Sequence, residues 1–338
     1  MTAIKFSEDV HNVRSKGYFS IETSTGVKYA HTVVLAIGGG HQTDLPIKAG
    51  EEGGACHSSN LLKHGLLAPH VQHKINANKD TTVAVIGGGL TSAQIVDLCI
   101  RKGVTRVLHI MRGHFKVKHF DLDLSWVAKY KNSNLSAFWM ADTDEERFEI
   151  IGEARNGGSI TPAYKSVLEA HEKSGRMQRY THTRVVSQNW DVQTNTWKLL
   201  TDPPTVNLPM IDYVYFATGT RADIESLPFL QDLRKKYPVS TVSGLPCLTD
   251  DLQWSSDVPL FVAGRFAGLR LGPGAANLEG ARVGAERITW RLQEILDKIN
   301  AEDYEPIETD EGRRLMDLQK RSESSWTHLN MYEALLQT

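Results

Sequence analysis

Apolar residues occur along this chain in short continuous runs that end in glycine. Three such runs are 32–37, 82–86 and 211–217, and a glycine follows each of them directly or after one residue. A continuous apolar run of this length is typical of a parallel strand buried on both faces. The pattern therefore predicts parallel strands that each end in a tight turn.

The second run opens a strand–helix–strand unit. The strand 82–86 is followed by a predicted helix over 91–102, which Gly103 ends, and then by a second strand over 106–111. The apolar positions of the helix fall on one face: Ala93, Val96, Cys99 and Ile100. A unit of about thirty residues suits a parallel crossover, so the sequence predicts an α/β fold.

The remaining pattern predicts peripheral elements. Residues 18–30 and 179–200 are each expected to contain a hairpin, and the charged residues 142–174 to form a helical insertion that restarts at Pro162. A long helix is expected from about Ala275, with an apolar stripe of Leu278, Ala281, Ala285, Ile288, Leu292 and Ile295. The C-terminal tail is expected to dock through Trp326 and Met331.

Composition narrows the class of protein. With 338 residues, 41% of them hydrophobic, and a net charge of -2, the chain has no basic surface for nucleic acid or an anionic membrane. No apolar run has membrane-spanning length and no signal peptide is found, so a cytoplasmic location is expected. The three separated cysteines and the scattered histidines form neither a dithiol nor a zinc pattern, so any redox chemistry must come from a bound cofactor and no metal is expected.

The glycines after residue 86 have the spacing of a dinucleotide-binding loop. Gly87 is expected to form the turn, Gly89 to admit the cofactor pyrophosphate, and Ser92 to take the third, helix-packing position. Leu90 and Thr91 then open the helix whose N-terminus faces the phosphates. A glycine motif alone is a weak signal, but the strand before it and the helix and strand after it strengthen the prediction.

The end of the second strand indicates which nicotinamide is bound. NAD-binding proteins place an acidic residue there, whereas this chain has Arg112. A guanidinium can pair with the 2′-phosphate of NADP or stack on adenine. We therefore predict NADP as the cofactor; the alternative is a solvated arginine at a strand exit.

Together these pieces resemble the flavin-dependent monooxygenases with two dinucleotide-binding domains, which include flavin-containing, Baeyer-Villiger and lysine or ornithine N-hydroxylating enzymes. In that family an NADPH domain interrupts an FAD domain, and an Ala-Thr-Gly-like strand end marks each crossing. Ala36-Ile-Gly38 and Ala217-Thr218-Gly219 match the two crossings, with the 87–92 motif between them. The resemblance covers roughly residues 32–288.

Two further segments match the family. Gly53 to His57 and Ser58 resemble a Gly-x-x-x-His fingerprint, in which His57 either positions a cofactor or is simply held by a backbone hydrogen bond. Its flanks depart from the family pattern at Glu51 and Leu61. The resemblance also assigns flavin contacts to Gly264, Arg265, Gly272 and Gly274, although the family usually has an aspartate at the position of Arg265.

The resemblance implies an α/β fold in which a Rossmann-like NADP-binding domain (76–204) is inserted into a remnant FAD/NAD(P)-binding domain (1–75 and 205–300), followed by the tail 301–338. It implies a flavoprotein oxidoreductase: NADPH reduces FAD, the reduced flavin and oxygen form a C4a-hydroperoxide, and a small-molecule substrate is hydroxylated. The resemblance assigns no catalytic acid or base.

The FAD-binding Gly-x-Gly-x-x-Gly unit with which that family begins has no counterpart in residues 1–30. FAD binding is therefore the doubtful part of the cofactor prediction. A non-catalytic NADP-binding pseudoenzyme or partner subunit remains the alternative. A homo-oligomer or partner chain is expected to cover the uncovered strand 33–37.

Overall fold

The computed structural model describes residues 1, 3–7, 17–39, 46–48, 51–61, 65–204 and 208–301. The described part of the chain forms two compact units. Unit 1 contains 1–38, 223–271 and 275–338, and unit 2 contains 39–222 and 272–274. Because unit 2 lies within the sequence of unit 1, the predicted fold class, one α/β domain inserted into another, is confirmed.

Unit 2 is built on a five-stranded parallel sheet in the order β5-β11-β6-β7-β8. Its strands are β5 (Ala55–His57), β6 (Thr82–Ile86), β7 (Arg106–Ile110), β8 (Met177–Tyr180) and β11 (Tyr213–Phe216). The predicted boundaries at 75/76 and 204/205 place β5 and β11 in the other domain. The structure differs because both strands hydrogen-bond into this sheet, β11 between β5 and β6.

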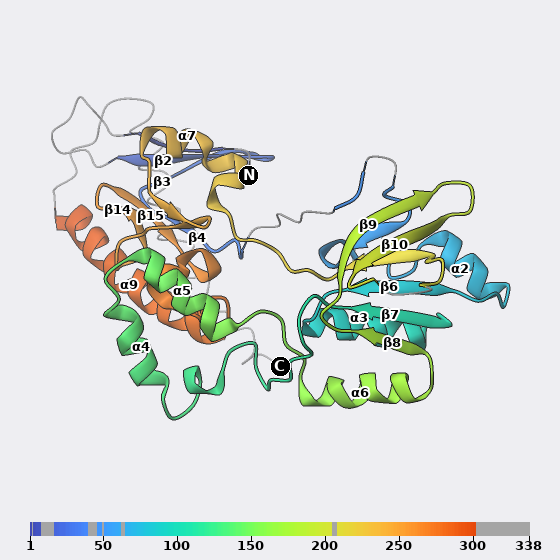
Figure 1. Ribbon diagram of the computed structural model, residues 1–338. Coiled ribbons are helices and arrows are strands. Elements are labelled where there is room, and N and C mark those ends of the chain that lie inside the picture. Colours follow the sequence, from blue (N-terminus) through green and yellow to red (C-terminus); the bar gives the residue numbers. More distant parts are fainter. Residues whose placement is uncertain are drawn as a thin grey trace, which may run out of the picture. The chain divides into compact units, whose positions relative to one another are not determined.

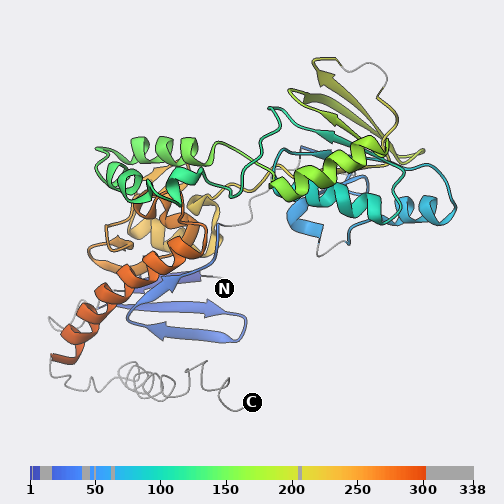
Figure 2. The ribbon, with the colours of Figure 1, turned by 90° about the horizontal axis from the view of Figure 1, so that it is seen from below.

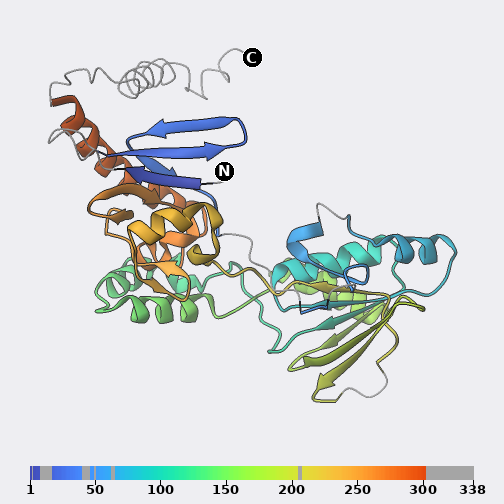
Figure 3. The ribbon, with the colours of Figure 1, turned by 90° about the horizontal axis from the view of Figure 1, so that it is seen from above.

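Helices cover one face of this sheet and a hairpin covers the other (Figure 3). The helices are α2 (Pro69–Asn76), α3 (Leu90–Arg101) and α6 (Pro162–Lys173), and the hairpin joins β9 (Arg184–Asp191) to β10 (Thr196–Asp202). Figure 2 shows the same layers from the opposite side. Because both faces of the sheet are covered, β6 and β11 are continuous runs of apolar residues.

The rest of unit 2 is helical, as predicted for 142–174. Its elements are η1 (Ser58–Asn60), η2 (Leu124–Trp126), α4 (Lys131–Trp139) and α5 (Asp144–Arg155). The hydroxyl of Thr143 accepts a hydrogen bond from the Glu146 amide at the start of α5, and Asn156 ends that helix in the left-handed conformation. Thr161 caps α6 and Pro162 is its first residue, as predicted.

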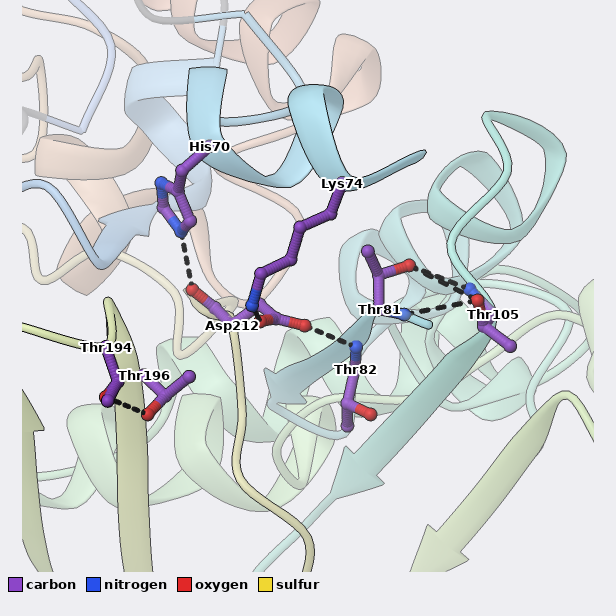
Figure 4. A network of polar contacts seen from close by, with 8 residues as sticks. All are labelled: His70, Lys74, Thr81, Thr82, Thr105, Thr194, Thr196 and Asp212. Carbon is purple, nitrogen blue, oxygen red and sulfur yellow. Dashed lines mark hydrogen bonds and ion pairs between the residues drawn. The ribbon is translucent and has the colours of Figure 1, made fainter. Parts of the chain in front are cut away.

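The amino edge of the sheet is tied together by one buried carboxylate (Figure 4). Asp212, immediately before β11, accepts hydrogen bonds from the Lys74 ammonium on α2 and, at 2.7 Å, from the Thr82 amide that begins β6. The His70 ring donates to the Asp212 carbonyl oxygen at 2.9 Å. Asp212 therefore fixes α2, β6 and β11 at the edge opposite the glycine-rich loop.

Unit 1 combines an antiparallel sheet, β1-β2-β3, with a small sheet in the order β14-β15-β4. Its strands are β1 (Ala3–Ser7), β2 (Tyr18–Thr23), β3 (Gly26–Ala30), β4 (Val33–Leu35), β12 (Thr241–Val242), β13 (Leu245–Pro246), β14 (Gln253–Ser255) and β15 (Val258–Val262). Its helical segments are η3 (Ile224–Ser226), η4 (Pro228–Leu230), α7 (Gln231–Lys236), η5 (Gly264–Ala267), α8 (Gly268–Leu271) and α9 (Leu278–Ala301), as labelled in part in Figure 1. The tail beyond 301, with Trp326 and Met331, lies outside the described residues.

The long helix differs from its prediction. It begins at Leu278, after an Asn277 side chain that accepts from the Gly280 amide, and not near Ala275. Leu278 is 90% exposed, whereas Ile288 is 4% exposed. A Cβ at Gly284 would lie 3.1 Å from the Leu271 side chain, so the helix packs closely at a buried glycine, which the pattern of apolar residues does not predict.

Candidate functional site

The candidate site begins at the carboxyl edge of β6 and β11. The Gly87 amide donates to the Ile110 carbonyl oxygen at 2.9 Å, and the Ala217 amide donates to the Ile86 carbonyl oxygen at 2.8 Å. Gly87 has φ +151°, and a Cβ built there would lie 2.3 Å from the Ala217 carbonyl oxygen. Only glycine therefore allows the turns after the two strands to pack together.

The glycine-rich loop leads directly into α3. Gly89 is the N-cap residue and supplies no side chain, so the first-turn amides of Leu90 and Thr91 are not capped by a side chain. Thr91 is exposed and Leu90 half-buried. An uncapped helix N-terminus after a glycine turn offers N–H donors and a positive dipole end to a phosphate. The residues present therefore fit a dinucleotide pyrophosphate.

Ser92 replaces the third glycine of the motif without opening the packing. Its side chain is fully buried, and its hydroxyl donates to the Gly89 carbonyl oxygen at 2.6 Å. The backbone of Gly158 lies against the same loop, since a Cβ at residue 158 would be 2.9 Å from the Gly89 nitrogen. The sequence pattern predicts that the helical insertion restarts at Pro162, but not that the turn before it packs on the glycine-rich loop.

One buried side chain that contacts this loop is not predicted from the sequence. His109 on β7 is fully buried, and its Nε2 lies 2.9 Å from the Gly87 carbonyl oxygen and 3.0 Å from the Ser92 hydroxyl oxygen. Burial, the largest cause, lowers the pKa of His109 to about 4. The available signal was a histidine between the apolar residues Leu108 and Ile110 of a predicted strand.

Arg112 lies at the end of β7, where the 2′-substituent of the adenosine ribose is expected. The side chain is exposed and forms no ion pair with any described residue. Its guanidinium is therefore available for a phosphate.

His57, the last residue of β5, connects this strand to the turn at Thr218 and Gly219. The Ser59 amide donates to its Nδ1 at 3.2 Å, and its Nε2 donates to the Gly219 carbonyl oxygen at 3.1 Å. Burial is the main cause that lowers the pKa of His57, which favours the neutral ring. Both ring nitrogens are used within the protein, so His57 holds the turn at Thr218 and Gly219, which are exposed. Ser58, the next residue, begins η1.

The remaining predicted residues fall into two places. Gly38 and Gly264 follow β4 and β15, which are parallel neighbours, so both glycines lie at the same carboxyl edge in unit 1. Arg265 is half-buried beside Gly264 in η5. Gly272 and Gly274 belong to unit 2 and precede α9 by several residues, so neither is at its N-terminus.

Other chemistry is not supported by the described residues. They contain no group of three histidine, cysteine or acidic side chains that could hold a metal ion. The three cysteines are free, and burial raises the pKa of Cys99 to about 12, so this thiol is unreactive. No described helix has the length and apolarity needed to cross a membrane.

Three solved structures that are similar in fold are monooxygenases or hydroxylases of amines. The cadaverine monooxygenase DfoA from Erwinia amylovora, solved with FAD, is 14% identical with a TM-score of 0.64, over 86% of this chain and 68% of its own. The ornithine hydroxylase PvdA from Pseudomonas aeruginosa is 18% identical with a TM-score of 0.64, over 87% and 70%. The ornithine N-hydroxylase KtzI from Kutzneria sp. 744, solved with reduced FAD, NADP⁺ and L-ornithine, is 17% identical with a TM-score of 0.65, over 87% and 71%.

At these identities the structures establish the fold alone. No curated protein sequence matches the chain. The family assignment comes from the sequence model of L-lysine 6-monooxygenase/L-ornithine 5-monooxygenase, which matches residues 1–222 and so covers both crossing segments and the whole glycine-rich loop. This chain therefore belongs to the L-lysine 6-monooxygenase/L-ornithine 5-monooxygenase family of flavin-dependent N-hydroxylating monooxygenases.

Proposed function

We propose that the chain binds NADPH at residues 87–92 and, together with FAD, hydroxylates the terminal amino group of a small aliphatic amine. The observation that carries the proposal is the Gly87 turn, which no other residue could form, leading into an uncapped helix N-terminus. DfoA acts on cadaverine, and PvdA and KtzI on ornithine. All these substrates are primary amines, which supports the same class here.

The cofactors and the residues of this chain have different proposed roles. When bound, NADPH and FAD would supply the redox chemistry that transfers one oxygen atom of dioxygen to the amine. The residues of this chain bind and orient: the amides at the start of α3 hold the pyrophosphate, Arg112 pairs with the 2′-phosphate, and His57 holds the Gly219 turn. Unit 2 is thus the proposed nicotinamide domain, and Gly38 and Gly264 of unit 1 form the proposed flavin edge.

The direct test is turnover. Purified protein with FAD, NADPH and lysine, ornithine or cadaverine should form a hydroxylated amine, detected by mass spectrometry, in proportion to NADPH consumed. No product from any of the three amines, with hydrogen peroxide accounting for all NADPH consumed, would contradict hydroxylation of this class.

Cofactor preference is tested separately at Arg112. Replacing Arg112 with Ala should weaken NADPH binding by roughly 10-fold or more, because a charge-assisted pair is lost, while NADH binding stays within about 2-fold. Arg106→Ala is a matched control, since Arg106 is also exposed but begins β7 at the opposite edge of the sheet. Equal losses for both nicotinamides would contradict the 2′-phosphate role.

A second candidate is an NADP-binding protein without its own flavin. It requires a nicotinamide site only, and the glycine turn that leads from a strand into a helix at 87–92 provides the residues for one. Incubation with FAD and gel filtration distinguishes the two candidates. Flavin absorbance that co-elutes with the protein supports the monooxygenase, and its absence alongside tight NADPH binding supports the second candidate.

The free edge of β4 supports a proposed partner. Within the described residues β4 pairs only with β15, and Val34 is 43% exposed. An apolar edge strand invites pairing with another strand. We therefore expect a homo-oligomer or a partner chain at this edge, and a monomer in sedimentation at micromolar concentration would contradict it.

A further inference from the structure

A buried side chain that has no part in the proposed cofactor contacts forms hydrogen bonds with the glycine-rich loop. His109 lies on β7, one strand over from the turn it contacts, and its ring is fully buried. The same Nε2 atom faces the Gly87 carbonyl oxygen at 2.9 Å and the Ser92 hydroxyl oxygen at 3.0 Å. One ring nitrogen thus reaches both ends of the loop, the turn residue and the first turn of α3.

The chemistry of these partners fixes the form of the ring. A carbonyl oxygen can only accept, and the Ser92 hydroxyl has committed its proton to the Gly89 carbonyl oxygen at 2.6 Å. Both contacts therefore require a proton on Nε2 of His109. The Nδ1 atom is buried and has no hydrogen-bond partner among the described residues. A neutral ring protonated on Nε2 satisfies these contacts without burying an uncompensated charge.

The neighbouring strand disfavours the charged form of the ring. Arg179 on β8 is the register partner of His109, and its guanidinium lies 4.0 Å from the centre of the Phe115 ring and donates to Glu172 at 2.9 Å. Burial, and then the positive charge of Arg179 on the adjacent strand, disfavour protonation of His109 and lower its pKa. The ring is therefore neutral at neutral pH, and its two acceptor partners select the tautomer with the proton on Nε2.

We propose that His109 is a positioning residue that holds the Gly87 carbonyl and the Ser92 hydroxyl so that the loop amides face the NADPH pyrophosphate. The inference rests on the proposed nicotinamide site. It goes beyond that proposal because it assigns the shape of the loop to a buried side chain of a different strand. Without the His109 N–H donor, the Gly87 carbonyl loses its hydrogen-bond partner. The peptide groups of the turn can then rotate, so that their amides no longer face the pyrophosphate.

The decisive experiment compares two ligands and two substitutions. His109→Leu removes the donor, and His109→Gln keeps an N–H donor on a chain of similar length. We expect the leucine variant to bind NADPH roughly 10- to 100-fold more weakly by fluorescence titration, and the glutamine variant to recover most of the affinity. Adenosine 2′-monophosphate, which lacks the pyrophosphate, should bind all forms equally by NMR titration.

A matched control separates positioning from general stability. Thr81 is also buried, hydrogen-bonds with Thr105 and lies at the amino edge of the sheet, away from the loop. Thr81→Val should lower the melting temperature without changing the NADPH affinity. A long-range proton–nitrogen NMR spectrum, compared with that of the glutamine variant, should show the His109 ring protonated on Nε2.

The outcomes distinguish the two proposals. If the unaltered protein does not bind NADPH, the nicotinamide site itself is wrong. If it does bind, then unchanged NADPH affinity in His109→Leu, equal losses for both ligands, or a ring protonated on Nδ1 would each overturn the positioning role.

Discussion

Replacing Gly87 with Ala tests the most constrained point of the site. The added Cβ would lie 2.3 Å from the Ala217 carbonyl oxygen and 2.9 Å from its carbonyl carbon. Both neighbours are backbone atoms, and the two turns are tied to adjacent strands by the Gly87 and Ala217 amides. To reach a contact of 3.0 Å the turns must separate by about 0.7 Å.

The expected cost follows from two terms. An alanine at φ +151° adopts a conformation that side chains disfavour by roughly 1–3 kcal/mol, and displacement of the turn weakens the hydrogen bonds that hold it. We expect the free energy of unfolding to fall by about 2–4 kcal/mol. NADPH binding should weaken at least 100-fold, because the first amides of α3 no longer point toward the pyrophosphate.

Urea unfolding and fluorescence titration measure the two effects. Gly152→Ala is the matched control: a Cβ there meets nothing within 4 Å, and an alanine inside α5 should be neutral or stabilising by up to about 1 kcal/mol. If Gly87→Ala bound NADPH like the unaltered protein, the assignment of this turn to the cofactor would be refuted.

Three further outcomes follow from buried groups. Burial lowers the pKa of His109 from 6.5 to about 4. The free energy of unfolding should therefore be constant above pH 6.5 and fall by about 3 kcal/mol as the pH drops to about 4. In urea titrations over this pH range, His109→Gln should show a smaller fall. Asp212→Ala should cost about 3 kcal/mol because the Thr82 amide loses its acceptor, and a loss below 1 kcal/mol would contradict the clamp. Trp197→Phe should cost about 2 kcal/mol in thermal unfolding, since its indole donates to the Gly54 carbonyl at 2.8 Å, and no change would refute that role.

The parts of the fold that the sequence predicted well are those with local signals. The strands β6 and β7 and the helix α3 follow from apolar runs, a 3.6-residue stripe and glycine punctuation within thirty residues. Ser92 at the third motif position also fits, because it packs without a Cβ clash and bonds back to Gly89.

What the sequence could not predict depends on distant partners. The three residues of β5 carry no strand signal of their own, and they join the sheet because β11, more than 150 residues later, pairs with them. His109 was missed for the same reason: its partners, Gly87 and Ser92, lie in the loop after another strand and in the helix that follows it. Local periodicity shows which residues are buried, but not which groups they meet.

The position of β11 in the sheet has a consequence for folding. The segment β6–α3–β7 closes short loops and can form early, whereas β11 must return across about 130 residues to pair with Thr82 through Asp212. The Ala217 turn that packs on Gly87 arrives with it. In a refolding experiment, the circular dichroism signal of helices should thus appear before NADPH binding. A nascent chain that ends before residue 217 should contain the glycine motif but not bind NADPH.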